Sequence, residues 1–213
     1  MIAIVDYGLG NLTSVRNAFA AVGARAERTS DPEAIRQADG LVLPGVGAAS
    51  AGMERLRDRG LDSVVLEVAR AGRPVLGLCL GMQLLFEWSE EGGTACLALL
   101  GGSVRLLRGD HKVPHIGWNQ VETRGGALWE GLPPAPYFYF VHSYICIPTE
   151  PSLLAGETEY GGRFCSAVVS GSIWGVQFHP ERSGNVGLQL IRNFARACAG
   201  TAQHPAMPQA HAM

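Results

Sequence analysis

Three residues whose side chains can cooperate in covalent hydrolysis follow strand-like segments of the sequence. Cys79 lies in G-L-C-L-G at residues 77–81, and His179 and Glu181 lie in H-P-E. A cysteine thiolate can attack an acyl carbon, an imidazole can take and return the proton, and a carboxylate can orient the imidazole. We therefore expect Cys79 as nucleophile, His179 as base and Glu181 as the orienting group of a catalytic triad.

The segment around Cys79 predicts a sharp turn between a strand and a helix. Residues 75–78 are apolar, and Gly77 and Gly81 stand two positions to either side of the cysteine. Such a G-x-C-x-G turn is the cysteine version of a nucleophile elbow, in which glycine avoids the clashes of a Cβ atom. The turn places the sulfur at a helix N-terminus, where the thiolate is favoured. The backbone N–H of Leu80 would then point toward a developing oxyanion.

The His-Pro-Glu segment follows a strand predicted over residues 173–178. In an extended chain, residues two apart face the same side, so His179 and Glu181 can converge, and Pro180 stiffens the link. One imidazole nitrogen would bind the carboxylate and the other would face the sulfur of Cys79. A single histidine is more often structural, so this interpretation depends on the cysteine turn. Both segments end predicted strands, and open α/β sheets place their sites at the carboxyl ends of strands.

The composition argues against several classes of protein. The 213 residues are 47% hydrophobic and carry a formal net charge of −2, which gives no electrostatic reason to expect nucleic acid or an anionic membrane as partner. No apolar run approaches the roughly 20 residues of a membrane helix, and the first residues do not resemble a signal peptide. Five cysteines without a C-x-x-C pair argue against a zinc ribbon or a disulfide framework. We expect a cytoplasmic protein in which four cysteines serve packing: Cys96, Cys146, Cys165 and Cys198.

The order of the predicted elements favours one α/β domain. The first half alternates strands and helices, which predicts a parallel sheet with helices on both faces, and the second half has short segments that favour antiparallel pairing. We expect an open, mixed, mostly parallel central sheet over residues 1–199 and a disordered tail over residues 200–213. The predicted strands are 2–5, 24–28, 41–43, 75–78, 104–107, 119–122, 137–141, 144–147, 166–169 and 173–178. The predicted helices include 53–59, 62–70, 82–88 and 186–198.

Three segments resemble the class I glutamine amidotransferases: PGVG at 44–47, GLCLGMQLLFE at 77–87 and GVQFHPE at 175–181. Further segments are similar to one branch of that family, the glutaminase subunits of imidazole glycerol phosphate synthase in histidine biosynthesis. These are DYGLGN at 6–11, KVPHIGWNQV at 112–121 and YFVHSY at 139–144. The resemblance spans roughly residues 1–198. It implies a flavodoxin-like fold, hydrolysis of glutamine through a cysteinyl thioester, and no cofactor. It also implies a heterodimer with a (β/α)₈-barrel cyclase subunit, which receives the ammonia.

The resemblance also implies roles for individual residues beyond the triad. The oxyanion would be bound by backbone N–H groups of a strand, Gly45, Val46 and Gly47, and of the turn at Leu80. We expect this strand to rest in an inactive geometry that the partner corrects. Glutamine would be bound by Gln83, Glu91, His142, Ser143 and Tyr144. The cyclase would be met by Asn11, Trp118, Asn119 and Arg182. Arg182 stands where relatives often carry Lys, which leaves the geometry of that contact open.

Other interpretations remain at this point. The elbow and the histidine also fit a cysteine hydrolase acting alone, or a non-catalytic subunit on the same scaffold, and a glutaminase for vitamin B6 or nucleotide synthesis would share the triad. Gly8-Leu9-Gly10 lacks the third glycine of a dinucleotide fingerprint, because Thr13 stands there. His111 and His115 are four apart, but Pro114 argues against a helical metal site. We therefore predict neither a metal nor a cofactor.

Overall fold

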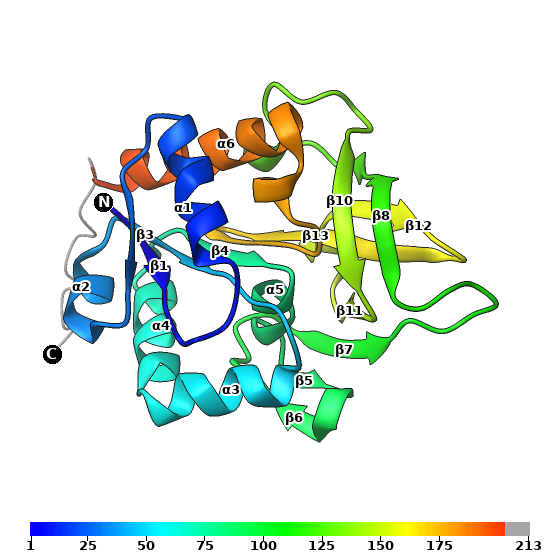
Figure 1. Ribbon diagram of the computed structural model, residues 1–213, viewed down its shortest axis with the longest axis horizontal. Coiled ribbons are helices and arrows are strands. Elements are labelled where there is room, and N and C mark those ends of the chain that lie inside the picture. Colours follow the sequence, from blue (N-terminus) through cyan, green and yellow to red (C-terminus); the bar gives the residue numbers. More distant parts are fainter. Residues whose placement is uncertain (203–213) are drawn as a thin grey trace, which may run out of the picture.

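The computed structural model describes residues 1–202, which form a central sheet with helices on both faces (Figure 1). Its first part is parallel throughout, in the order β2-β1-β3-β4-β14. Strand β14 comes from the end of the chain but lies beside β4, so the two segments that carry the predicted triad are neighbours in the sheet. The bounds are β1 Ile2–Val5, β2 Ala26–Thr29, β3 Gly40–Leu43, β4 Val75–Leu78 and β14 Ile173–Val176.

The sheet continues from β14 through antiparallel strands. The order runs β14-β13-β11-β7-β5-β6, with β12 paired to β13 and β9 to β12, and only β5 and β7 are parallel here. A separate antiparallel pair, β8 and β10, stands beside this part (Figure 1). The bounds are β5 Trp88–Ser89, β6 Thr94–Ala95, β7 Gly102–Leu106, β8 His115–Gln120, β9 Glu122–Thr123, β10 Tyr137–His142, β11 Tyr144–Pro148, β12 Leu154–Glu159 and β13 Arg163–Ser170.

Helices α1 and α6 cover one face of the parallel strands, and α3 and α4 cover the other (Figure 1). The α-helices are α1 Leu12–Ala21, α2 Pro32–Gln37, α3 Ala49–Asp58, α4 Leu61–Arg70, α5 Leu80–Leu84 and α6 Gly184–Ala202. Short 3₁₀ helices are η1 Glu91–Gly93, η2 Ala127–Trp129, η3 Pro151–Leu153 and η4 Pro180–Arg182. No helix in residues 1–202 is long and apolar enough to cross a membrane.

Apart from the edge strand β2, the parallel strands contribute to two cores because their side chains alternate between the faces. In β1, Ala3 and Val5 pack with the helices α2 to α4, whereas Ile2 and Ile4 pack with α1 and α6. All four residues are buried, as expected for a sheet covered on both faces. The parallel strands are therefore a rigid frame whose loops can carry a site.

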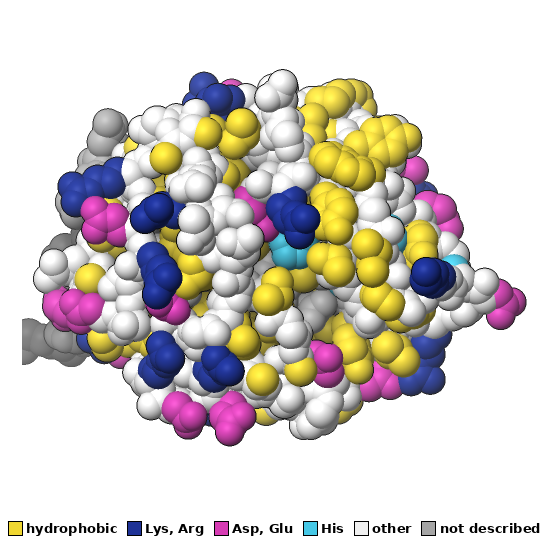
Figure 2. Space-filling model, viewed as in Figure 1, with side chains coloured by type: hydrophobic (Ala, Val, Ile, Leu, Met, Phe, Trp, Pro, Cys, Tyr) yellow, Lys and Arg dark blue, Asp and Glu magenta, His cyan; other side chains and the backbone are white. Residues whose placement is uncertain are grey.

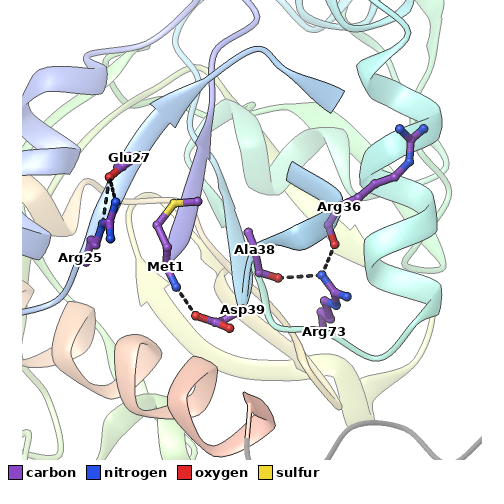
Figure 3. Close-up of polar contacts among 7 residues, drawn as sticks. All are labelled: Met1, Arg25, Glu27, Arg36, Ala38, Asp39 and Arg73. Carbon is purple, nitrogen blue, oxygen red and sulfur yellow. Dashed lines mark hydrogen bonds and ion pairs between the residues drawn. The ribbon is translucent and has the colours of Figure 1, made fainter. Parts of the chain in front are cut away.

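Polar contacts join the amino ends of the parallel strands (Figure 3). The N-terminal ammonium group of Met1 pairs with Asp39, which precedes β3. Arg73, which precedes β4, donates to the carbonyl of Ala38 at 2.8 Å and to the carbonyl of Arg36. The exposed pair of Arg25 and Glu27 contributes little to stability. These contacts lie at the amino ends of the parallel strands, whereas Cys79 and His179 lie at the carboxyl ends.

The predicted fold class is confirmed, but several element boundaries were wrong. The helix predicted over 82–88 is α5, which spans Leu80–Leu84, and Trp88 already lies in β5. The strand predicted over 119–122 is mostly β8, which begins at His115. Strand β12 was not predicted, because its sequence LAGETE has little β-branched or aromatic content. Helix α6 continues to Ala202, past the predicted domain end at 199, and the rest of the predicted tail lies outside the described residues.

Candidate active site

Cys79 occupies a strained turn between β4 and α5. Its φ of 53° and ψ of −109° lie outside the regions that side chains favour. Its backbone N–H donates to the carbonyl of Val176 at 2.8 Å, which ties the turn to β14. The flanking glycines are sterically required: a Cβ atom on Gly77 would lie 2.7 Å from the backbone nitrogen of Met82, and one on Gly81 would lie 1.7 Å from the carbonyl oxygen of Leu43.

Helix α5 begins directly after the cysteine but has only five residues, Leu80–Leu84. Leu80 is its first residue, so no carbonyl one turn earlier binds its backbone N–H. That N–H is the donor expected at an oxyanion. Because the helix is so short, its dipole supports a thiolate less than the longer helix predicted from the sequence would.

His179 and Glu181 form a buried pair beside this turn. Nδ1 of His179 lies 2.9 Å from Oε1 of Glu181, and the two side chains are 7% and 3% exposed. The local backbone is not the one expected, because Pro180–Arg182 forms a 3₁₀ helix and not an extended segment. The two side chains converge through this turn. Oε2 of Glu181 is also buried and has no hydrogen-bond partner among the described residues.

The ionisation of His179 depends on both predicted triad partners. Burial lowers its pKa, but interactions with Cys79 and Glu181 outweigh burial and raise the pKa to about 10. Nε2 is buried and makes no hydrogen bond of ordinary geometry to the described residues. Nε2 is therefore the ring atom left to interact with the sulfur. The raised pKa favours an imidazolium at His179 beside the sulfur of Cys79.

The predicted oxyanion strand follows β3 and lies against the same turn. The Tyr7 hydroxyl donates to the carbonyl of Pro44 at 2.5 Å, and burial raises the pKa of Tyr7, as does the nearby Cys79. A Cβ atom on Gly45 would lie 2.4 Å from this hydroxyl oxygen and 3.0 Å from Cβ of Leu80. Tyr7 thus holds the start of the segment at Pro44, whereas the end of that segment projects outward. Val46 is 44% exposed, and Gly47 has a φ of 104° that favours glycine.

A cavity of about 480 Å³ opens beside Cys79. All five residues expected to bind glutamine line it: Gln83, Glu91, His142, Ser143 and Tyr144. Three of the four predicted oxyanion residues, Val46, Gly47 and Leu80, line this cavity with Cys79, whereas Gly45 lines a smaller cavity nearby. Glu91 also has a structural role, because its Oε2 accepts from the backbone N–H of Ala49 at 2.7 Å and so caps α3.

Two amide side chains connect this cavity wall with the sulfur. Nε2 of Gln83 donates to the carbonyl of Tyr144 at 3.2 Å and to Oε1 of Gln177 at 3.0 Å. Nε2 of Gln177 in turn lies 3.6 Å from the sulfur of Cys79. No role was predicted for Gln177 from the sequence, although its position two residues before His179 on an extended segment could have placed it on the same side.

Two buried histidines hold the turn between β10 and β11. Nδ1 of His142 donates to the Tyr144 carbonyl at 2.9 Å, and Nε2 of His142 lies 2.9 Å from Nδ1 of His115. Asn119 donates to Nε2 of His115 at 3.3 Å and to the carbonyl of Glu159 at 3.0 Å. Burial lowers the pKa of each histidine to about 4, so both are neutral near pH 7. Asn119, predicted to face the cyclase, therefore has its amide nitrogen engaged within the chain.

A second, smaller cavity of about 70 Å³ lies beside His179. Its walls include His179 and Glu181 and two residues predicted to face the partner, Asn11 and Arg182. Val46 and Val141 line both cavities, so they separate the space beside Cys79 from this one. The side chain of Asn11 also caps α1 by accepting from the Ser14 N–H at 3.2 Å.

An apolar face of β8 and β10 adjoins the second cavity. Ile116, Trp118 and Tyr137 are 57%, 56% and 54% exposed. They alternate with inward-facing residues of the two strands, and Figure 2 shows hydrophobic side chains gathered over this pair. The Arg182 guanidinium lies 4.8 Å from the ring centre of Tyr139, which links this face to η4. Asn11 and Arg182 at the second cavity and Trp118 on the adjoining face are thus brought together, as predicted for residues that face the partner.

Comparison with known proteins agrees with this geometry. The family model described as glutamine amidotransferase class-I matches residues 3–198. Imidazole glycerol phosphate synthase subunit HisH of Moorella thermoacetica is 50% identical over 207 residues, which cover 95% of this chain and 99% of that protein. The subunit of the same name from Bacillus cereus is 47% identical over 197 residues, covering 91% and 93%.

Solved structures share the fold at lower identity. A glutamine amidotransferase crystal structure superposes with a TM-score of 0.75 at 18% identity, covering 93% of this chain and all of the other. The structure of PurLQS from Thermotoga maritima gives a TM-score of 0.69 at 16% identity, covering 92% of this chain and 97% of the other. At these identities the likeness concerns the fold alone. With the family model and the HisH relatives, it follows that the chain belongs to the class I glutamine amidotransferase family, in the group of imidazole glycerol phosphate synthase HisH subunits.

Proposed function

We propose that this protein is the glutaminase subunit of imidazole glycerol phosphate synthase in histidine biosynthesis. It hydrolyses L-glutamine to glutamate and ammonia, and a (β/α)₈-barrel cyclase subunit uses the ammonia to make imidazole glycerol phosphate and aminoimidazole carboxamide ribonucleotide. The observation that carries the proposal is the buried pair of His179 and Glu181, 2.9 Å apart, beside a strained Cys79 that faces a cavity. The membership in the HisH group supports the identity of the synthase. We further propose that it acts in the cytoplasm, and its five free cysteines fit a reducing compartment.

The chemistry proceeds through two acyl transfers at the sulfur. The thiolate of Cys79 attacks the carboxamide carbon of glutamine, and a C–S bond forms while the carbonyl oxygen becomes an oxyanion. The C–N bond then breaks, and His179 gives its proton to the departing ammonia, which leaves a γ-glutamyl thioester. Neutral His179 next takes a proton from water, which attacks the thioester carbon. The C–S bond breaks, and glutamate leaves while the thiolate and imidazolium are restored.

The oxyanion requires donors that the turn and the neighbouring strand can supply. The backbone N–H of Leu80 is one, and the segment Gly45, Val46 and Gly47 would provide the other. The anchoring of Pro44 by Tyr7 leaves the exposed end of this segment free to respond to a partner. We propose that the segment rests in an inactive geometry and that the cyclase turns an N–H toward the cavity.

The partner is proposed to dock on the apolar face of β8 and β10. That face lies beside the small cavity lined by His179 and Arg182, and ammonia formed at Cys79 would reach that cavity by passing between Val46 and Val141, which line both cavities. The resemblance implies that relatives often carry Lys at the position of Arg182, which keeps the positive charge, but the Arg182 guanidinium already lies over the Tyr139 ring. Trp118 is the proposed anchor because large exposed aromatic residues dominate protein interfaces.

The test is glutaminase turnover with and without the cyclase. We expect slow release of ammonia from the isolated chain, strong stimulation by the cyclase with its nucleotide ligand, and no turnover by Cys79→Ser in either state. A glutaminase for vitamin B6 or nucleotide synthesis would instead respond to a different synthase. Turnover of a non-glutamine amide without any partner would support a hydrolase acting alone, and the cavity lined by Gln83 and Tyr144 argues against that alternative.

A further inference from the structure

Gln177 is a fully buried amide that the proposed mechanism does not use. It follows β14, is 0% exposed, and its Nε2 lies 3.6 Å from the sulfur of Cys79. Its backbone N–H donates to the carbonyl of Ser166 at 2.9 Å, which fixes the segment against β13. Gln177 and His179 thus both approach the nucleophile from the same stretch of chain.

A backbone carbonyl determines which atom of Gln177 faces the sulfur. The carbonyl of Tyr144 can only accept, so the Gln83 atom that lies 3.2 Å from it must be the amide nitrogen. The same nitrogen lies 3.0 Å from the Gln177 side chain, which must therefore present its oxygen there. The remaining end of the Gln177 amide, its NH₂ group, is the one directed at the sulfur.

Besides the imidazole of His179, one acceptor and one donor among the described residues lie beside the sulfur. The carbonyl of Val141 lies 3.8 Å away and, as an acceptor only, favours the protonated thiol. The NH₂ group of Gln177 has the opposite effect, because a donor stabilises the thiolate. The five-residue helix α5 offers little dipole of its own. The Gln177 amide therefore adds a second donor to the one that the His179 imidazolium provides at this turn.

We propose that Gln177 is a further catalytic residue, whose side-chain N–H donates to the Cys79 sulfur and stabilises the thiolate, with Gln83 as the residue that positions it. The inference rests on the proposed role of Cys79 as nucleophile. The inference also limits how Gln83 can bind a substrate, because Tyr144 and Gln177 accept both hydrogens of the Gln83 amide. Its oxygen is the group left for a donor in the cavity, which suits the ammonium or carboxamide N–H groups of glutamine.

The test measures the thiolate of Cys79 without substrate or partner. Wild type and Gln177→Met are alkylated with iodoacetamide across a pH series, and the Cys79 peptide is quantified by mass spectrometry. The midpoint of alkylation in Gln177→Met should rise by about one pH unit, because the thiolate loses its donor. With the cyclase present, kcat should fall about tenfold while KM changes less than about twofold, since Gln177 does not line the cavity. Gln37→Met, the same substitution at an exposed position, should leave the midpoint unchanged.

The outcome that overturns the inference is an unchanged midpoint in folded Gln177→Met. If that variant does not fold, Gln83→Met decides, because it leaves Gln177 in place but removes the group that orients it. We expect a smaller shift of the midpoint in the same direction, with a higher KM because Gln83 lines the cavity. An unchanged midpoint there also overturns the inference. Glutaminase activity retained by Cys79→Ser would instead overturn the proposed function, whatever the midpoints are.

Discussion

A Cβ atom added to Gly81 would lie 1.7 Å from the carbonyl oxygen of Leu43. The turn after Cys79 is therefore packed backbone to backbone against the end of β3. Leu43 immediately precedes the segment that begins with Pro44, and Cys79 precedes Leu80. This contact thus fixes the distance between the turn at Cys79 and the start of the proposed oxyanion strand.

Replacing Gly81 by Ala should destabilise the protein by about 3 kcal/mol, since neither backbone can move away without disrupting the sheet. The measurement is urea unfolding followed by circular dichroism. Gly200→Ala is the matched control, because a Cβ atom there meets nothing within 4 Å and should change stability by less than about 0.5 kcal/mol. Equal unfolding midpoints for Gly81→Ala and wild type would show that the contact is not present in solution.

His179 should make stability depend on pH in the alkaline range. Its pKa rises from 6.5 to about 10 on folding, because Cys79 and Glu181 favour the imidazolium. The stabilisation is complete below pH 6.5 and is lost as pH rises toward 10. We therefore expect the difference in unfolding free energy between wild type and His179→Gln to shrink between these values. Urea unfolding at several pH values measures it. A difference that stays constant would mean that the pKa is not raised.

His115 should have the opposite effect in the acidic range. Burial lowers its pKa from 6.5 to about 4, so His115 binds a proton less readily in the folded protein than in the unfolded chain. Its contribution is present above pH 6.5 and is lost as pH falls toward 4. In His115→Gln the loss of stability from about pH 7 to about pH 5 should be smaller than in wild type. An equal loss in both proteins would place the acid sensitivity elsewhere.

Trp118 should matter for the partner and not for the fold. It is 56% exposed and contacts Tyr139 edge-on, with ring centres 6.2 Å apart. Trp118→Ala should weaken binding of the cyclase at least about tenfold. Isothermal titration calorimetry measures the affinity, and thermal unfolding checks the fold. Ile147→Ala serves as control, because Ile147 is 45% exposed but lies on β11, outside the face of β8 and β10. Equal effects of both substitutions would argue against the proposed docking face.

The sequence allowed the parallel half of the fold to be predicted because its strands are short apolar runs between clear helices. Residues 75–78 and the two glycines around Cys79 indicated the elbow, and the structure shows why each glycine is needed. Strand β12 was missed because its pairing with β13 depends on tertiary contacts and not on local propensity. The length of α5 was overestimated because the apolar residues after Leu84 continue a helical pattern but are buried without being helical.

Residue types were enough to select the candidate residues of the site, but not to predict the contacts that support them. His179 and Glu181 are two apart, so their meeting was expected, although a 3₁₀ turn and not an extended strand brings it about. The contact of Gln177 with Cys79 joins residues 98 positions apart. Likewise, the pairing of His115 and His142 follows from the register of β8 and β10, which the sequence does not specify. These buried polar contacts became visible only in the folded chain.

The most direct test of the triad is covalent labelling by a glutamine analogue that carries an electrophile at the γ position. Wild type should form one adduct, on Cys79, as read by peptide mass spectrometry. Labelling of His179→Ala should be about a hundredfold slower, because the thiolate loses its base, while His111→Ala should match wild type within about twofold. An adduct on any of the other four cysteines, or labelling of His179→Ala at the wild-type rate, would contradict a triad of Cys79, His179 and Glu181.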